Sequence, residues 1–121
     1  MEPKQAWKLA RRLLYDVDYD PGIEHKNKWV YASQESEEHK KRFESWIKGK
    51  GIQENEDIWI LNEFKSKESQ KMKWGEFLKD WPEILDDDDI RVTNINFTWI
   101  LEYKSQKVAR FGRKYNKGTK K

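Results

Sequence analysis

The chain contains no cysteine, which excludes disulfide bonds and zinc sites built on thiolates. It also has no run of about 18 apolar residues, the length that a membrane-spanning helix needs. The opening residues, MEPKQAWKLARR, lack the apolar core of a signal peptide. These absences predict a soluble, cytoplasmic protein with no membrane partner.

Aromatic side chains, in contrast, are abundant. Charged residues make up 39% of the chain, a composition that favours disorder, but seven Trp, five Phe and five Tyr supply the bulky apolar side chains that disordered chains lack. The 121 residues show no repeat and no low-complexity linker. We therefore expect one folded domain over residues 1–112, followed by a flexible basic tail over 113–121.

Hydrophobic periodicity predicts the fold class. Apolar residues at helical spacing predict three helices, over residues 4–17, 36–48 and 69–81. Runs of β-branched and aromatic residues predict strands over residues 28–32, 57–64, 98–103 and 107–111, the first at a sheet edge and the last two as a hairpin. Ser33 or Ser36 would cap the second helix, Ser69 would cap the third, and Pro82 would end or bend the third. The pattern predicts an α+β domain with a mainly antiparallel sheet.

The period-two alternation in the predicted hairpin also assigns faces to its side chains. Trp99 and Leu101 should point toward the helices. Lys107 and Arg110 should lie on a solvated edge that discourages strand-to-strand aggregation. With seven tryptophans in one small domain, we expect Trp29 or Trp46 to be partly exposed.

Charge is distributed unevenly along the chain. Residues 104–121 hold eight of the 25 Lys and Arg and none of the 22 acids, so a body with a net charge of −5 carries an end of +8. The segment DWPEILDDDD, residues 80–89, holds six acids and no base. A solvated acidic turn with a solubilising basic tail would account for both features without any function.

Two functional interpretations of these charges stay open. In the first, the acidic segment docks into a basic cleft of a protein partner, with Asp86, Asp87, Asp88 and Asp89 as the contact residues. In the second, the basic end binds nucleic acid through Arg110, Arg113, Lys114 and Lys117, with Phe111 and Tyr115 stacking on bases. We favour the protein-docking interpretation, because an acidic body would repel a polyanion.

A partial calcium-loop pattern occurs in DVDYDPG. Asp16, Asp18 and Asp20 occupy the first, third and fifth positions of such a loop. However, the sixth position, which needs a glycine, is Pro21, and the twelfth is Asn27 instead of a bidentate glutamate. We expect a structural turn here, with cation binding as the alternative.

The order Asp89, Glu102, Lys104 resembles the PD-(D/E)xK nucleases, a family in which two carboxylates hold a divalent metal and the lysine positions the attacking water. Glu-x-Lys triplets are frequent in this Glu- and Lys-rich chain, so we expect these three residues to be exposed strand-end residues. The two histidines, His25 and His39, lie in charged segments away from any nucleophile signature. We therefore predict no enzymatic activity, no metal site and no cofactor.

The general make-up of the chain is small, Lys- and Trp-rich and free of catalytic motifs, with a WILEY strand before the last hairpin. In this it resembles the small immunity proteins that protect bacteria against polymorphic toxins. The resemblance carries no defining motif, so it transfers no site residue. It implies a toxin-neutralising, protein-binding function; nucleic-acid binding and, after it, a metal-dependent nuclease activity are the alternatives.

Overall fold

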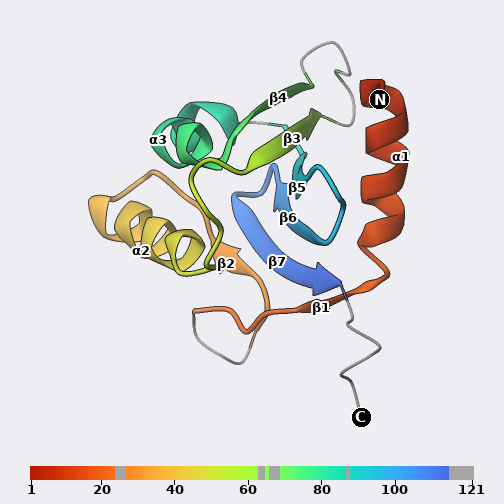
Figure 1. Cartoon of the computed structure of the whole chain (residues 1–121). Helices are drawn as coiled ribbons and strands as arrows, with labels where there is room; N and C mark the ends of the chain where they lie inside the picture. Colours follow the sequence, from red (N-terminus) through yellow and green to blue (C-terminus); the bar gives the residue numbers. More distant parts are fainter. Residues whose placement is uncertain (24–26, 63–64, 66–68, 87, 115–121) are drawn as a thin grey trace.

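The computed structural model describes residues 1–23, 27–62, 65, 69–86 and 88–114. Its centre is an antiparallel sheet of seven strands in the order β1-β7-β6-β5-β3-β4, with β2 also paired to β7 (Figure 1). The strands are β1 (Val17–Tyr19), β2 (Val30–Tyr31), β3 (Asp57–Asn62), β4 (Gln70–Lys73), β5 (Ile90–Asn94), β6 (Trp99–Lys104) and β7 (Val108–Lys114). The helices are α1 (Pro3–Leu13), α2 (Glu37–Lys48) and α3 (Trp74–Ile84). The predicted α+β class is confirmed.

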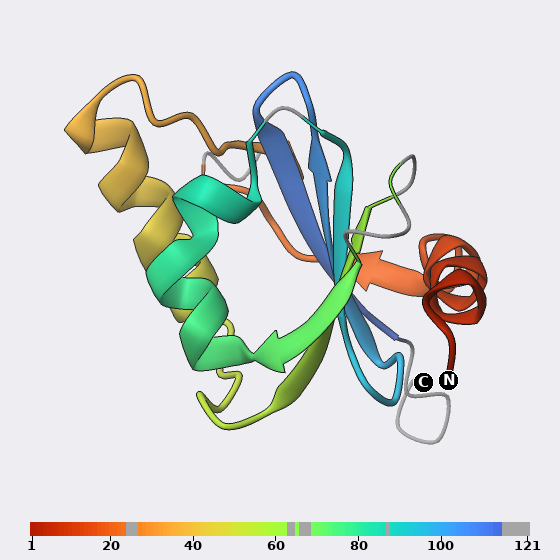
Figure 2. The same ribbon diagram turned by 90° about the horizontal axis from the view of Figure 1, so that it is seen from above.

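Helices cover both faces of the sheet. Figure 2 shows α2 and α3 together on one face and α1 on the other. Each face has its own core of buried apolar side chains, a large one under α2 and α3 and a smaller one under α1. Among the described residues, no helix is long and apolar enough to cross a membrane.

Strand β6 shows how alternation divides the side chains between the two cores. Trp99 and Leu101 point into the core under α2 and α3, as predicted, and Ile100 points into the core under α1. The Trp99 ring lies edge-on to Trp74 at 5.4 Å and stacks on Phe111 at 5.4 Å. Strand β6 therefore contributes side chains to the cores on both faces of the sheet.

The second helix agrees with its prediction. Ser36 is the N-cap of α2, and its Oγ accepts a hydrogen bond from the backbone N–H of His39 at 3.1 Å. Gly49 follows as the C-cap residue. The local signals at both ends of α2 are sufficient to predict its bounds, because this segment does not pair with a distant strand.

The first helix is shorter than predicted, because α1 ends at Leu13 and Val17 begins β1. Val17 and Tyr19 pair with Lys114 and Gly112 of β7. A Cβ atom at Gly112 would lie 2.5 Å from Val17 Cγ2, so the glycine makes room for β1 to pair closely. The helical spacing of Val17 therefore reflects burial in the core under α1 and not membership of the helix.

The prediction of a helix over 69–81 capped by Ser69 is wrong at its start. Gln70–Lys73 form strand β4, paired with β3, and Ser69 Oγ accepts a hydrogen bond from the backbone N–H of Asn62. Helix α3 begins at Trp74 and continues through Pro82 to Ile84. The apolar stripe is still correct, since Trp74, Phe77 and Trp81 are buried.

Strand boundaries differ slightly from prediction. β2 covers Val30–Tyr31 within the predicted 28–32, and β3 ends at Asn62, with the predicted 63–64 outside the described residues. Lys107 lies in the β6–β7 turn with a φ of 69°, and β7 continues through Arg113 and Lys114, past the predicted boundary at 112. Residues 115–121 lie outside the description.

The predicted solvated edge is also wrong, because β7 is paired on both sides: with β6 on one side and with β1 and β2 on the other. The Arg110 guanidinium lies over the rings of Tyr19, at 3.9 Å, and Trp29, at 4.6 Å. Lys107 Nζ donates a hydrogen bond to the backbone oxygen of Asp86. In the described part of the sheet, the strand order ends instead at β1 and β4.

Candidate functional site

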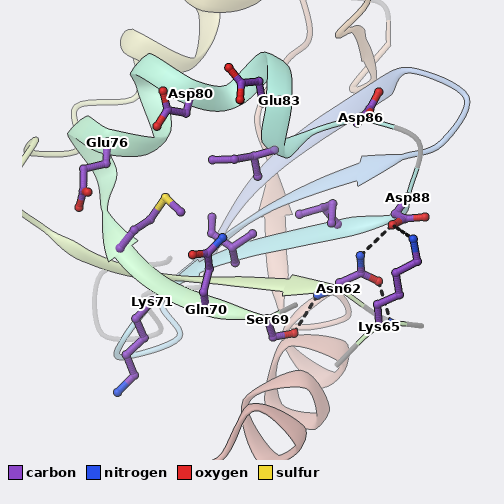
Figure 3. Close-up of a pocket in the computed structure, with 14 residues that line it drawn as sticks. Asn62, Lys65, Ser69, Gln70, Lys71, Glu76, Asp80, Glu83, Asp86 and Asp88 are labelled. Atoms are coloured by element: carbon purple, nitrogen blue, oxygen red, sulfur yellow. Dashed lines mark hydrogen bonds and ion pairs between the residues drawn. The ribbon is translucent and has the colours of Figure 1, made fainter. Parts of the chain in front are cut away.

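A cleft of about 950 Å³ lies between α3 and the end of the sheet formed by β3, β4 and β5 (Figure 3). Its apolar lining comes from four side chains of the sheet and of α3: Ile60, Met72, Ile84 and Ile90. The cleft exists because β4 leads directly into α3, which packs its buried aromatic side chains against the sheet.

Five carboxylates line this cleft. Glu76, Asp80 and Glu83 are spaced by four and three residues, which places them on one side of α3. Asp86 and Asp88 follow on the connection to β5, with the Asp86 carboxylate pointing outward at the rim of the cleft (Figure 3). Lys65 and Lys71 are also among the lining residues, but the Lys71 ammonium points away from the cleft and lies over the Trp59 ring. We call this set of five carboxylates the acidic row.

Asp88 is held at the end of the row by two donors. The side-chain amide of Asn62 donates to Asp88 Oδ2 at 3.0 Å, and Lys65 Nζ lies 3.2 Å from the same oxygen. The hydrogen bond from Asn62, followed by that from Lys65, holds the pKa of the Asp88 carboxyl below its ordinary value. Asp88 therefore carries its charge at neutral pH.

This lowered pKa predicts that the free energy of unfolding depends on pH in the acid range. A carboxyl with a depressed folded-state pKa stabilises the fold above its unfolded-state pKa of about 3.9, and the contribution is lost as pH falls through the folded-state value. Urea unfolding should show Asp88→Asn less stable than the wild type at neutral pH, with the difference shrinking in acid. A difference that stays constant with pH would contradict the role of this charge.

The neighbouring aspartates are used differently. The backbone oxygen of Asp86 accepts hydrogen bonds from Tyr103 Oη at 2.8 Å and from Lys107 Nζ at 2.7 Å, while its side chain is exposed. Asp89 Oδ1 accepts from the backbone N–H of Ser105 at 2.7 Å, which fastens it to the β6–β7 turn. Of the predicted docking residues, Asp86 and Asp88 line the cleft, Asp89 does not, and Asp87 lies outside the described residues.

The residues predicted to form a basic nucleic-acid site are not gathered on one face. Arg110 points to the α1 side of the sheet, where it bonds Glu102. Arg113 points to the other side, where it donates to the backbone oxygen of Lys50 at 2.7 Å. Lys114 is exposed at the end of β7, and Lys117 and Tyr115 lie outside the described residues. Nucleic-acid binding by this end stays a prediction.

Glu102 is not the exposed strand-end residue that we predicted. Its side chain is buried, 2.8 Å from Arg110 Nε and 3.5 Å from Lys104 Nζ, and it pairs across the sheet with Arg91. Asp89 is bonded to Ser105 instead. Within the described part of the chain, no group of three or more Asp, Glu or His side chains is placed to hold a metal ion.

The turn expected from the partial calcium pattern is wrong, because Val17–Tyr19 form strand β1, but the last aspartate of the pattern has a structural use. Asp20 Oδ2 lies 3.0 Å from Lys50 Nζ and 3.8 Å from Arg113 Nε. The Lys50 side chain is nearly buried, at 8% exposure, and its Nζ lies 4.0 Å from the centre of the Trp46 ring. Asp20 thus joins the segment after β1 to the end of α2 and to β7.

We expect Asp20→Ala to lower the free energy of unfolding by about 2 kcal/mol, because it leaves the nearly buried Lys50 side chain without its main carboxylate. Burial already lowers the pKa of Lys50, and the hydrogen bond to Asp20 opposes this. Removing Asp20 should lower that pKa further. Since the folded state then releases the proton before the unfolded chain does, part of the lost stability should return at alkaline pH.

The matched control is Asp16→Ala, which removes an exposed carboxylate from the same partial pattern. Thermal unfolding should leave this variant close to the wild type. Equal losses in the two variants, or a loss that calcium abolishes, would contradict the structural role of Asp20.

The remaining predictions concern the exposure of aromatic residues outside the cleft. Trp29 and Trp46 are both half-buried, which confirms the expected partial exposure. His39 stacks against the exposed ring of Tyr31 at 6.0 Å, and His25 lies outside the described residues.

The sequence predicted part of the acidic row. The acidic segment 80–89 contains Asp80, Glu83, Asp86 and Asp88, but the docking prediction named only its last four aspartates. Glu76 was missed, although its spacing from Asp80 and Glu83 on a predicted helix was the signal that could have found it.

No protein-family model, no curated protein and no solved structure matches this chain. The resemblance to polymorphic-toxin immunity proteins stays a prediction. The functional assignment rests on the chemistry of the cleft.

Proposed function

We propose that this chain is a non-enzymatic protein-binding module whose acidic cleft docks a basic surface of a protein partner. The observation that carries the proposal is the acidic row, five carboxylates that line one cleft over an apolar floor. Opposite charges across an interface steer association and suppress wrong partners, and the apolar floor adds area that can be removed from water. The resemblance to immunity proteins makes a toxin the first class of partner to test.

The short range of electrostatic interactions and the positions of the charged side chains favour the cleft over the basic end as the docking surface. At physiological salt the Debye length is about 8 Å, so charges act on a molecule docked against them and hardly across the fold. Four members of the acidic row, Glu76, Asp80, Glu83 and Asp86, are exposed. Arg110 and Arg113, in contrast, engage Glu102 and Asp20 on opposite faces of the sheet.

We expect no hydrolase activity. Glu102, which the nuclease-like pattern needs as a metal ligand, bonds Arg110 instead, and Asp89 is bonded to Ser105. Incubation of the purified protein with DNA and RNA, in magnesium or manganese, should leave both substrates intact. Cleavage that disappears in Glu102→Gln would contradict the proposal.

Capture of a partner from host cells tests the docking function. We define a cleft variant, Glu76→Gln, Asp80→Asn and Glu83→Gln, and a control variant with the same charge change at exposed acids elsewhere, Asp16→Asn, Glu35→Gln and Glu38→Gln. Immobilised wild type and control variant should retain the same basic protein, and the cleft variant should lose it. Recovery of nucleic acid in place of a protein, abolished by deleting residues 113–121, would instead favour the nucleic-acid alternative.

A further inference from the structure

Among the residues that the structure describes, the outer edge of strand β4, beside the cleft, is not paired with another strand. β4 is the last strand in the sheet order, and among the described residues it pairs with β3 alone. An edge strand presents backbone N–H and C=O groups that can pair with another chain. On β4 the outward groups belong to Lys71 and Lys73, and the N–H of Lys73 already donates to Glu76 Oε1 at 3.0 Å, so in the described strand Lys71 offers the unbonded N–H. Gln70, Lys71 and Met72 of this strand also line the cleft, so the free edge and the acidic row belong to one surface.

The two faces of β4 differ in charge. Met72 and Gln70 pair with Ile58 and Ile60 of β3, whose side chains point into the core under α2 and α3, so they lie on the cleft side. Lys71 and Lys73 alternate with them and lie on the α1 side, where Lys71 Nζ is 4.9 Å from the centre of the Trp59 ring and Lys73 Nζ is 2.7 Å from Asp57. A strand added at this edge would therefore meet carboxylates with one set of alternate side chains and lysines with the other.

We propose that the partner binds by adding an extended segment to the free edge of β4, with Lys or Arg at alternate positions facing the acidic row. This proposal rests on the docking function proposed above and specifies its mode. Main-chain hydrogen bonds to β4 supply affinity, and the alternate side chains supply specificity. Neutral or acidic residues fill the other positions, because a cation there would lie beside Lys71 or Lys73.

The same alternation disfavours a second copy of this chain as the occupant. Two β4 edges that met would bring Lys71 and Lys73 close to their own copies, and like charges on neighbouring strands are destabilising. The complementary occupant is a strand whose cations all lie on one face. Four residues of β4 span about 13 Å, so a segment of about seven residues covers the edge and its flanks.

Backbone methylation separates strand addition from simple charge attraction. The probe is a fluorescent seven-residue peptide of alternating Lys and Thr. Two derivatives carry N-methyl groups on the Lys amides or on the Thr amides, because these two sets of N–H groups point to opposite edges of an extended peptide. A third peptide of the same composition has its lysines in one block.

The proposal predicts that the alternating peptide binds the wild type and the control variant, with binding weakened about tenfold or more in the cleft variant. One methylated derivative should lose about tenfold in affinity, because its blocked edge faces β4, while the other keeps its affinity. Glu76→Gln retains the oxygen that accepts from the backbone N–H of Lys73, so the cleft variant should keep the start of α3. Amide spectra check that it remains folded.

Two other results would overturn the proposal in distinguishable ways. If all four peptides bind equally and the cleft variant still weakens them, a basic partner docks at the cleft without forming a strand, and the docking function stands alone. If none of the peptides binds in a way that depends on the acidic row, both the strand mode and the docking function fail.

Discussion

Replacing Trp81 with alanine is expected to lower the free energy of unfolding by about 4 kcal/mol. The Trp81 side chain is fully buried, its ring lies edge-on to Phe43 at 4.8 Å, and its indole N–H donates to Glu44 at 3.0 Å. The truncation leaves a cavity between α2 and α3 and removes the bond that joins them. Since small domains are stable by only about 5–15 kcal/mol, this variant should unfold at markedly lower urea concentration.

Trp46→Ala is the matched control for Trp81→Ala. Trp46 is half-buried and contacts the edge of the same core, so its loss should cost about 1–2 kcal/mol. Trp81→Phe should recover part of the loss at Trp81, because a ring is retained while the N–H is lost. A greater cost at Trp46 than at Trp81 would show that α2 and α3 pack differently from this structure.

Glu102→Ala should lower the free energy of unfolding by about 3 kcal/mol. Glu102 is only 4% exposed, and it is the carboxylate that Arg110 Nε and Lys104 Nζ both approach on the α1 side of the sheet. Its removal leaves the Arg110 guanidinium, whose side chain is 26% exposed, without its carboxylate. Urea unfolding followed by tryptophan fluorescence measures the loss.

The control for Glu102→Ala is Asp57→Ala. Asp57 is paired with Lys73 at 2.7 Å, but both side chains are about half exposed, so the expected change stays within about 0.5 kcal/mol. Glu102→Gln, which keeps an acceptor for Arg110 but loses the charge, should fall between the two. A change below about 0.5 kcal/mol in Glu102→Ala would contradict the central place of this carboxylate.

Local signals in the sequence predicted those parts of the fold that depend on local structure. The Ser36 cap and Gly49 define α2, and the period-two alternation around Trp99 defines β6 and its two faces. The strong helical stripe after residues 70–73 predicts a helix that includes them, but pairing with β3 makes them a strand. Such pairing joins residues distant in the chain, and no local pattern records it.

The candidate site likewise depends on contacts that local sequence patterns do not predict. The concentration of acids in 80–89 predicted four of the five members of the acidic row, because charge density can be read directly from the sequence. The sequence did not show that Glu76 joins the row, that Asp89 turns toward Ser105, or that Arg110 is enclosed by Tyr19 and Trp29. Each of these depends on which strands become neighbours in the sheet.

The central claim is that the acidic cleft is the docking surface, and amide chemical-shift mapping tests it most directly. Labelled protein is titrated with the basic partner recovered from host cells, at low salt and again at high salt. The largest shifts should fall on Gln70–Lys73 and on the Glu76–Glu83 side of α3, and they should weaken as salt rises. Shifts confined to β7 and the basic end, with the cleft unaffected, would contradict the claim.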